Sequence, residues 1–153
     1  MQALTSPQHP VRILLAEDSE DDILIIQRAF RRGQISVDLQ VVRDGQEVLD
    51  YLQQQGKFSQ PEVAPRPDLL MLDINMPRKD GLTTLREIRA DPRLRLLPVI
   101  ILTTSRAQED IVSSYESGAN TYVTKPNQID KYIEEMRLID SYWRLVAVRP
   151  PLV

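Results

Sequence analysis

The stretch DLLMLDINMP, residues 68–77, decides how the rest of the chain is interpreted. Four apolar residues in a row, 69–72, are typical of a strand that is buried on both faces. The run ends in a carboxylate, Asp73, and the chain turns shortly afterwards at Pro77. A buried charge without a partner is costly. Asp73 therefore has a cationic partner, or it stands at the end of the strand to do chemistry.

The same pattern recurs along the chain, with apolar runs separated by segments of helical period. Further strands are predicted over residues 11–16, 37–42, 98–103 and 121–123. Helices are predicted from apolar residues spaced three and four apart: Ile23, Ile26 and Phe30; Val48, Leu49 and Leu52; Leu82, Leu85 and Ile88; Ile111, Val112 and Tyr115; and a long last helix from Ile129 to Trp143. This alternation predicts an α/β domain whose parallel sheet is covered by helices on both faces.

Polar residues stand where these strands end. They are Glu17 and Asp18 after the first strand, Asp73 after the third, Thr103 and Thr104 at the fourth, and Lys125 after the fifth. In an open parallel sheet the carboxyl ends of the strands share one edge, where ligands bind. Clustered carboxylates repel one another unless a cation compensates, and Mg²⁺ prefers oxygen ligands. With Lys125 as a second positive charge, the pattern predicts a site for Mg²⁺ and a phosphoryl group.

The composition narrows the chemistry further. The 153 residues include no cysteine and one histidine, His9, in the polar stretch before the first strand. A thiolate nucleophile, a Ser-His-Asp triad and a cysteine or histidine zinc site are therefore excluded. Asp73 is left as the nucleophile, because an aspartate carboxylate can form an acyl phosphate.

Charge and hydropathy predict a soluble, cytoplasmic protein. The formal net charge of −3 argues against nucleic acid as the main partner. The cluster Arg86, Arg89, Arg93 and Arg95 is interpreted as a solvated helix face. No apolar run is long enough to span a membrane, and the N-terminus does not look like a signal peptide.

Four segments together resemble the receiver domains of two-component response regulators, in the order and spacing of that family. They are LLAEDSEDD (14–22), DLLMLDINMPRKDG (68–81), PVIILTTS (98–105) and SGANTYVTKP (117–126). The resemblance covers residues 11–145 and leaves a flexible leader, 1–10, and a C-terminal tail, 146–153. It implies a flavodoxin-like, doubly wound sheet of five parallel strands in the order 2-1-3-4-5, with five helices.

The resemblance also implies a role for each polar residue. Asp73 would be the phosphoacceptor; Glu17, Asp18, Asp73 and the backbone carbonyl of Asn75 would hold Mg²⁺; Lys125 would bind phosphoryl oxygens; and Thr103 and Tyr122 would form the switch pair. The chain departs from the commonest family pattern in two places. The acidic pair is Glu17-Asp18 rather than two aspartates, and Thr104 stands where a small residue is frequent. Both departures are expected to modulate rates and to leave the chemistry unchanged.

The phosphoryl donor is expected to be a separate histidine kinase, because the chain has no suitable histidine. The Pro-rich stretch 56–67 and the tail YWRLVAVRPPL, residues 142–152, resemble stand-alone receivers that serve phytochrome-type kinases. The signal would then pass to a downstream phosphotransfer protein or through a homodimer. The face formed by the fourth helix, fifth strand and fifth helix is the expected dimer surface.

Three other functions share parts of this pattern. A phosphatase or phosphotransferase of the haloacid-dehalogenase type also forms an aspartyl phosphate, but it needs an acid two residues after the nucleophile, where this chain has Asn75. A flavodoxin-like cofactor carrier needs a phosphate-cradling first loop, whereas this loop is acidic. A receiver fold retained only for binding is disfavoured, because every expected type of site residue is present.

Overall fold

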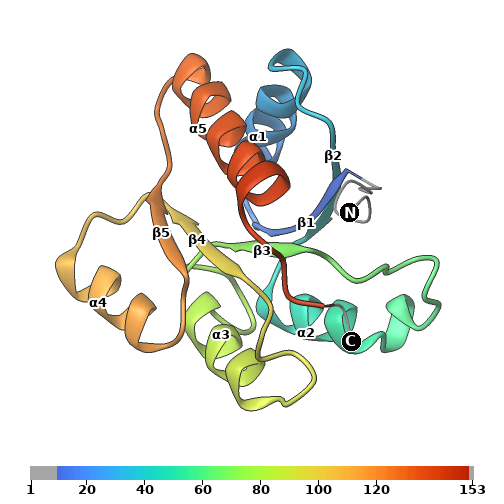
Figure 1. Ribbon diagram of the computed structural model, residues 1–153. Helices are drawn as coiled ribbons and strands as arrows, with labels where there is room; N and C mark the ends of the chain where they lie inside the picture. Colours follow the sequence, from blue (N-terminus) through green and yellow to red (C-terminus); the bar gives the residue numbers. More distant parts are fainter. Residues whose placement is uncertain (1–9, 152–153) are drawn as a thin grey trace.

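A five-stranded parallel sheet forms the centre of the molecule in this computed structural model, which describes residues 10–151 (Figure 1). The strands are β1 (Val11–Ala16), β2 (Val37–Val42), β3 (Leu69–Leu72), β4 (Val99–Thr103) and β5 (Thr121–Thr124). They lie side by side in the order β2-β1-β3-β4-β5, and each neighbouring pair is parallel. The predicted flavodoxin-like sheet and its strand order are confirmed.

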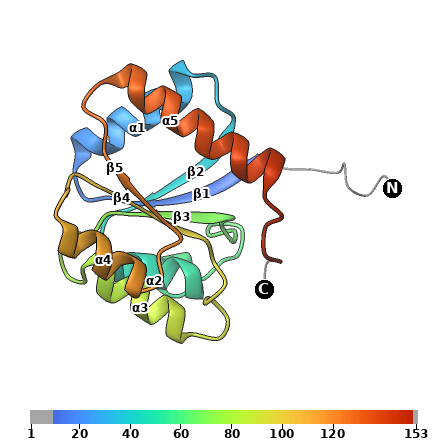
Figure 2. The same cartoon turned by 60° about the vertical axis from the view of Figure 1, so that its left-hand side comes forward.

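Five α-helices alternate with the strands. They are α1 (Glu20–Arg32), α2 (Gly45–Gln53), α3 (Gly81–Ala90), α4 (Gln108–Glu116) and α5 (Ile129–Ser141), with a 3₁₀ turn, η2 (Gly56–Phe58), and a π-helical turn, η3 (Tyr142–Val146). Helices α1 and α5 pack together on one face of the sheet, and α2, α3 and α4 lie on the other (Figure 1 and Figure 2). None of the helices in the described part of the chain is long and apolar enough to cross a membrane.

The central strand β3 explains why the site lies at the strand ends. All four of its residues are buried, because alternate side chains enter two separate cores. Leu70 and Leu72 pack into the core under α2 and α3, whereas Leu69 and Met71 pack into the core under α1 and α5. No polar side chain fits along such a strand without losing its hydration. Reactive groups can therefore be placed only where the strand ends, at Asp73.

The helix that follows Asp73 begins unusually close to the strand. Gly81, the first residue of α3, lies against the backbone at Asp73, and a Cβ atom there would overlap the carbonyl oxygen of Asp73. The Gly81 N–H donates a hydrogen bond of 2.8 Å to the carbonyl of Ile74. Glycine is needed here because only a residue without a side chain permits this approach. The loop 74–80 is held as a tight turn beside Asp73 in consequence.

Helix α4 is confirmed, but its apolar residues are not core residues. Val112 is 47% exposed and Tyr115 is 49% exposed, and Ser114 is the buried residue of this helix. The reason is the position of α4 beside β5, which is an edge strand of four residues with no fully buried side chain. There is little sheet surface for α4 to cover. Its apolar face is left open to solvent.

The interpretation of the arginine cluster as a solvated face is wrong for Arg89. Its guanidinium donates hydrogen bonds of 2.7–2.9 Å to the carbonyls of Gly118, Arg95 and Leu97. A further bond of 3.1 Å reaches Oδ1 of Asn120. Burial lowers the pKa of Arg89, although the group stays charged because arginine is so basic. Arg89 therefore links α3 to the loop before β4 and to the loop before β5.

The C-terminal region differs from the predicted long helix. The α-helix ends at Ser141, and the residues up to Val146 form the π-helical turn η3. Beyond it, Arg149 lies 3.0 Å from the buried carboxylate of Asp68, which also accepts a 2.8 Å hydrogen bond from the N–H of Arg12. This part of the tail thus returns to the amino-terminal edge of the sheet. The predicted leader, 1–10, lies outside the described residues except for Pro10.

Candidate functional site

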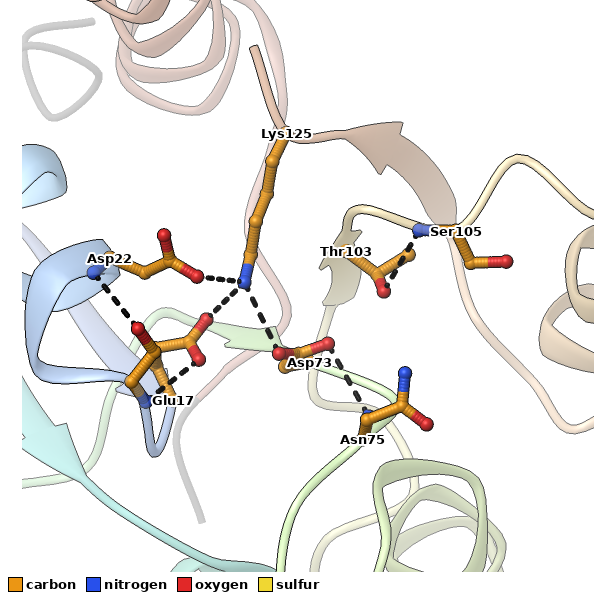
Figure 3. Close-up of polar contacts among 8 residues, drawn as sticks. Glu17, Asp22, Asp73, Asn75, Thr103, Ser105 and Lys125 are labelled. Carbon is orange, nitrogen blue, oxygen red and sulfur yellow. Dashed lines mark hydrogen bonds and ion pairs between the residues drawn. The ribbon is translucent and has the colours of Figure 1, made fainter. Parts of the chain in front are cut away.

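Lys125 brings the ends of three strands together. Its ammonium Nζ lies 2.6 Å from Oε1 of Glu17 and 3.2 Å from Oδ2 of Asp73 (Figure 3). All three residues are buried, with 1% of Glu17 and 8% of each of the other two exposed. The residues come from the ends of β1, β3 and β5, so the convergence that the strand-end pattern predicts is present.

Backbone hydrogen bonds fix the starting point of each of these side chains. The N–H of Glu17 donates to Val42 at 3.0 Å, that of Asp73 to Ala16 at 3.2 Å and that of Lys125 to Thr103 at 2.7 Å. Each bond continues the pairing of the sheet for one residue beyond the end of a strand. The three functional groups therefore project from rigid backbone rather than from free loops.

Burial and charge shift two proton affinities in this site. Burial is the main cause that raises the pKa of Glu17, and the charge of Asp73 adds to it, while the contact with Lys125 opposes both. Burial by itself would lower the pKa of Lys125, but its hydrogen bonds to Asp22 and Glu17 and the charge of Asp73 outweigh burial and raise it. Lys125 is therefore a permanent cation, and it faces three carboxylates, those of Glu17, Asp22 and Asp73.

The arrangement fits a hard divalent cation. Glu17, Asp18 and Asp73 each offer a carboxylate oxygen, and these oxygens lie within 4.8 Å of one another. Asp18 is exposed, so the cluster is open to solvent on that side. Asn75 is also exposed and adjoins the cluster, since its N–H donates to Oδ1 of Asp73 at 3.4 Å. Oxygen donors around an open position are what Mg²⁺ and Mn²⁺ require.

The predicted switch residues meet at Ser105 rather than at Asp73. The hydroxyl of Thr103, which is fully buried, accepts a hydrogen bond of 3.4 Å from the N–H of Ser105. The hydroxyl of Tyr122 donates to the carbonyl of the same residue at 2.9 Å. Thr104, by contrast, is exposed and lines a cavity of about 270 Å³ together with Lys125. The loop after β4 is thus bonded to both members of the predicted switch pair.

One residue of the site, Asp22, was missed in the sequence. Its Oδ2 lies 2.7 Å from the ammonium of Lys125, compared with 2.6 Å for Glu17 and 3.2 Å for Asp73 (Figure 3). In the sequence Asp22 stands three residues after Ser19, the residue that caps α1, and an acid at this position usually signals helix capping. That pattern gives no sign of a contact with a residue 103 positions away.

A second missed feature holds the loop after Asp73 in place. Asp44, the cap of α2, accepts two hydrogen bonds from Arg78, 2.8 Å from Nε and 3.0 Å from Nη2. Arg78 adopts a positive φ of 63°, which is uncommon for a residue with a side chain. Contact with Arg78, against the cost of burial, lowers the pKa of Asp44. This fork couples the loop that carries Asn75 to the start of α2.

Comparison with known proteins decides the family. The profile of the response regulator receiver domain matches residues 13–137. The chain belongs to this family. It is 40% identical to response regulator Rcp1 of Synechocystis over 141 residues, which are 92% of this chain and 94% of Rcp1.

Similar solved structures are also response regulators. The chain is similar to response regulator RPA3017, described in red light signalling of R. palustris, with a TM-score of 0.88, 39% identity, and 92% of this chain and 99% of that chain covered. It is also similar to the phosphorylated cyanobacterial phytochrome response regulator RcpA, with a TM-score of 0.84, 38% identity, and coverage of 94% and 100%. The Mn²⁺-bound form of Rcp1 matches with a TM-score of 0.80 and 38% identity, over 93% of this chain and 100% of that chain.

Family membership confirms the predicted class of function. The protein is a receiver-type response regulator, which takes up a phosphoryl group on an aspartate from a histidine kinase, and it is a signalling phosphoacceptor rather than a true enzyme. The haloacid-dehalogenase and flavin-carrier alternatives are set aside. The acidic cluster Glu17, Asp18 and Asp73 corresponds to a receiver metal site.

Replacing Asp18 tests this metal site. We expect Asp18→Asn to lower Mg²⁺ affinity by at least about tenfold, because the cluster loses an anionic ligand. In metal-free buffer the variant should be as stable as the parent or slightly more so, since repulsion among the carboxylates decreases. Calorimetric Mg²⁺ titration and thermal unfolding measure the two quantities.

The matched control is Asp21→Asn, which removes the same charge from an exposed residue in the first turn of α1. It should bind Mg²⁺ like the parent. An equal loss of Mg²⁺ affinity in the two variants would mean that Asp18 acts only through the overall charge and is not a metal ligand.

Proposed function

We propose that Asp73 is the phosphoacceptor and that Lys125 holds the phosphoryl group on it. The observation that carries this proposal is the contact of 3.2 Å between the Lys125 ammonium and Oδ2 of Asp73. A rigid strand end presents the carboxylate, and a buried cation stands where negative charge must accumulate. In this proposal residues 11–145 form the receiver unit, flanked by the leader and the tail.

The chemical step is a transfer between a nitrogen and an oxygen. A carboxylate oxygen of Asp73 attacks the phosphorus of a phosphohistidine on the kinase, so that an O–P bond forms and the N–P bond breaks. The electron pair of the broken bond stays on the imidazole nitrogen, which then takes up a proton. Lys125 neutralises charge on the phosphoryl oxygens during transfer, and its position is set before the donor arrives.

Mg²⁺ is the proposed cofactor. Glu17, Asp18, Asp73 and the backbone carbonyl of Asn75 would hold it, since all four offer oxygen atoms at the same edge of the sheet. When bound, the ion supplies positive charge to the phosphoryl oxygens. Glu17 lies between the proposed metal position and the Lys125 ammonium, because it belongs to the acidic cluster and also contacts Lys125 at 2.6 Å.

Phosphorylation is proposed to act on the loop after β4. The hydroxyl of Thr103, which accepts a hydrogen bond from the N–H of Ser105, would donate its own proton to a phosphoryl oxygen, and Tyr122 would follow because its hydroxyl is bonded to the same residue. A shift of a two-state equilibrium from 1:99 to 99:1 needs about 5.5 kcal/mol. Charge-assisted hydrogen bonds contribute about 1.5–3 kcal/mol each, so two at the upper end of this range or three near its middle supply that amount. Thr104, at the mouth of the adjoining cavity, would modulate the rates.

The proposed donor is a phytochrome-type histidine kinase in the cytoplasm. Support comes from the similarity to RcpA, a phytochrome response regulator, and to RPA3017, which is described in red light signalling. A downstream phosphotransfer protein is the proposed recipient of the signal. Profiling of phosphotransfer from a panel of histidine kinases tests the choice of donor.

Substitution of Asp73 tests the proposed phosphoacceptor. Asp73→Asn keeps the size of the side chain and removes the nucleophilic oxygen, so it should lose nearly all label transferred from a radiolabelled phosphorylated kinase in the presence of Mg²⁺. Asp130→Asn, at an exposed position in the first turn of α5, is the control and should be labelled like the parent. Stoichiometric labelling of the Asp73 variant would remove Asp73 from this role.

We further propose a homodimer through the face formed by α4, β5 and α5. Exposed apolar residues lie on this side of the chain, among them Val112 and Tyr115 on α4 and Leu138, 63% exposed, on α5. Leu138 also lines a groove of about 510 Å³ whose walls carry both charges, Lys131 and Glu135. Such a mixed surface suits a two-fold interface, in which each copy presents the same patch to the other.

Sedimentation with and without Mg²⁺ and beryllofluoride, a phosphoryl mimic, tests the dimer. The parent should double its mass with the mimic, and Leu138→Asp should weaken association at least about tenfold by placing a charge in the interface. Leu96→Asp, at a position 57% exposed in the loop before β4, is the control and should dimerise like the parent. A parent that stays monomeric with the mimic would end this proposal.

A further inference from the structure

Lys125 has one more carboxylate partner than the proposed chemistry uses. Its ammonium lies 2.6 Å from Glu17, 2.7 Å from Asp22 and 3.2 Å from Asp73. Glu17 and Asp73 belong to the acidic metal cluster, but the cluster does not include Asp22. Figure 3 shows Asp22 approaching Lys125 from α1, apart from the contact between Lys125 and Asp73. Within this site, the carboxylate of Asp22 therefore contacts Lys125 and is not part of the metal cluster.

Helix capping does not explain the position of the Asp22 side chain. In a capping box the acid at this position would turn back and accept the N–H of Ser19. That N–H instead donates to Oε2 of Glu17 at 3.1 Å. The backbone N–H of Asp22 donates to the hydroxyl of Ser19 at 3.3 Å, which holds the first turn of α1 in place. Its carboxylate is therefore free of the cap and directed at Lys125.

All three N–H groups of the Lys125 ammonium already face carboxylates. An ammonium has three N–H groups, and Glu17, Asp22 and Asp73 occupy three directions around it. A phosphoryl group on Asp73 would take over the direction that the free Asp73 carboxylate occupies, and Lys125 would then share its charge between that group and the carboxylates of Glu17 and Asp22. Glu17 belongs to the metal cluster and would be drawn toward a bound ion, whereas Asp22 keeps its charge next to the ammonium. Asp22 consequently opposes the movement of Lys125 toward the phosphoryl group and also repels that group.

We propose that Asp22 is a positioning residue that restrains Lys125 and thereby weakens the hold of the site on a phosphoryl group. The inference rests on the proposed function of Asp73 and Lys125. Asp22 contacts Lys125 and is also accessible to solvent. Its side chain is 33% exposed, and it lines the cavity of about 270 Å³ that also borders Thr104 and Lys125. A substitution there changes the charge beside Lys125 without opening the hydrophobic core.

Beryllofluoride affinity at saturating Mg²⁺, followed by fluorine NMR of the full chain, tests the proposal. Asp22→Asn should lower the half-saturating concentration of the mimic by about threefold to tenfold, because one nearby, partly solvent-screened negative charge is removed. Its Mg²⁺ affinity without the mimic should change by less than about threefold, since Asp22 is not in the metal cluster. Asp22→Glu, which restores the charge, should return mimic binding toward the parent value.

Asp21→Asn is the matched control, because it removes the same charge one residue earlier from an exposed position in the same turn. Mimic affinity that is unchanged or lower in Asp22→Asn, or equally raised in Asp21→Asn, would overturn the proposal. A collapse of Mg²⁺ affinity would overturn it too and make Asp22 a metal ligand. If Asp22→Asn does not fold, Asp22→Ser carries the same test with a smaller neutral side chain.

The same data separate this inference from the proposed function. Mimic binding by the parent that persists in Asp73→Asn would contradict the role of Asp73. Mimic binding that depends on Asp73 but not on Asp22 would leave that role intact and contradict only the restraint by Asp22.

Discussion

The contact between a buried ammonium and the carboxylates around it is the interaction on which the rest of this site depends. Lys125 faces Glu17, Asp22 and Asp73 within 3.2 Å, and only 5% of its side chain is exposed. Two unit charges at about 4 Å and an effective dielectric near 20 interact with about 4 kcal/mol before desolvation is counted. Burial raises the pKa of Glu17, and the contact with Lys125 opposes that shift. Lys125 therefore stabilises the acidic site before a metal ion or a phosphoryl group is bound.

The sheet supplies the geometry that this interaction needs. Parallel strands bring residues distant in sequence to one edge, and the pairing extends one residue past β1, β3 and β5. Two contacts hold the turn after Asp73. Gly81, the first residue of α3, packs against the backbone of Asp73, and Arg78 donates two hydrogen bonds to Asp44. Rigid placement of this kind reduces the reorganisation that phosphoryl transfer requires. The fold and the chemistry are therefore linked through the strand ends.

The features of this fold that depend on regular patterns are predictable from the sequence. Continuous apolar strands and helical spacing predict the five-fold alternation, and the polar residues after the strands predict the meeting of Glu17, Asp73 and Lys125. Contacts of a side chain that has several possible partners are not predictable in this way. Arg89 binds backbone carbonyls that come near it only when the chain folds, and Asp22 stands three residues after the helix cap Ser19, where an acid is normally assigned to capping. The spacing of apolar residues in α4 also says nothing about how much sheet is left for that helix to cover.

Removal of the cation is the most direct test of this account. In metal-free buffer with a chelator, Lys125→Met should lower the free energy of unfolding by about 3 kcal/mol or more, because it leaves buried carboxylates without their partner. Added Mg²⁺ should then stabilise the variant more than it stabilises the parent, and Lys131→Met, at an exposed lysine of α5, should behave like the parent. Denaturant unfolding of the three proteins gives these values. A Lys125→Met protein as stable without metal as the parent would contradict the central claim that this ammonium holds the acidic site together.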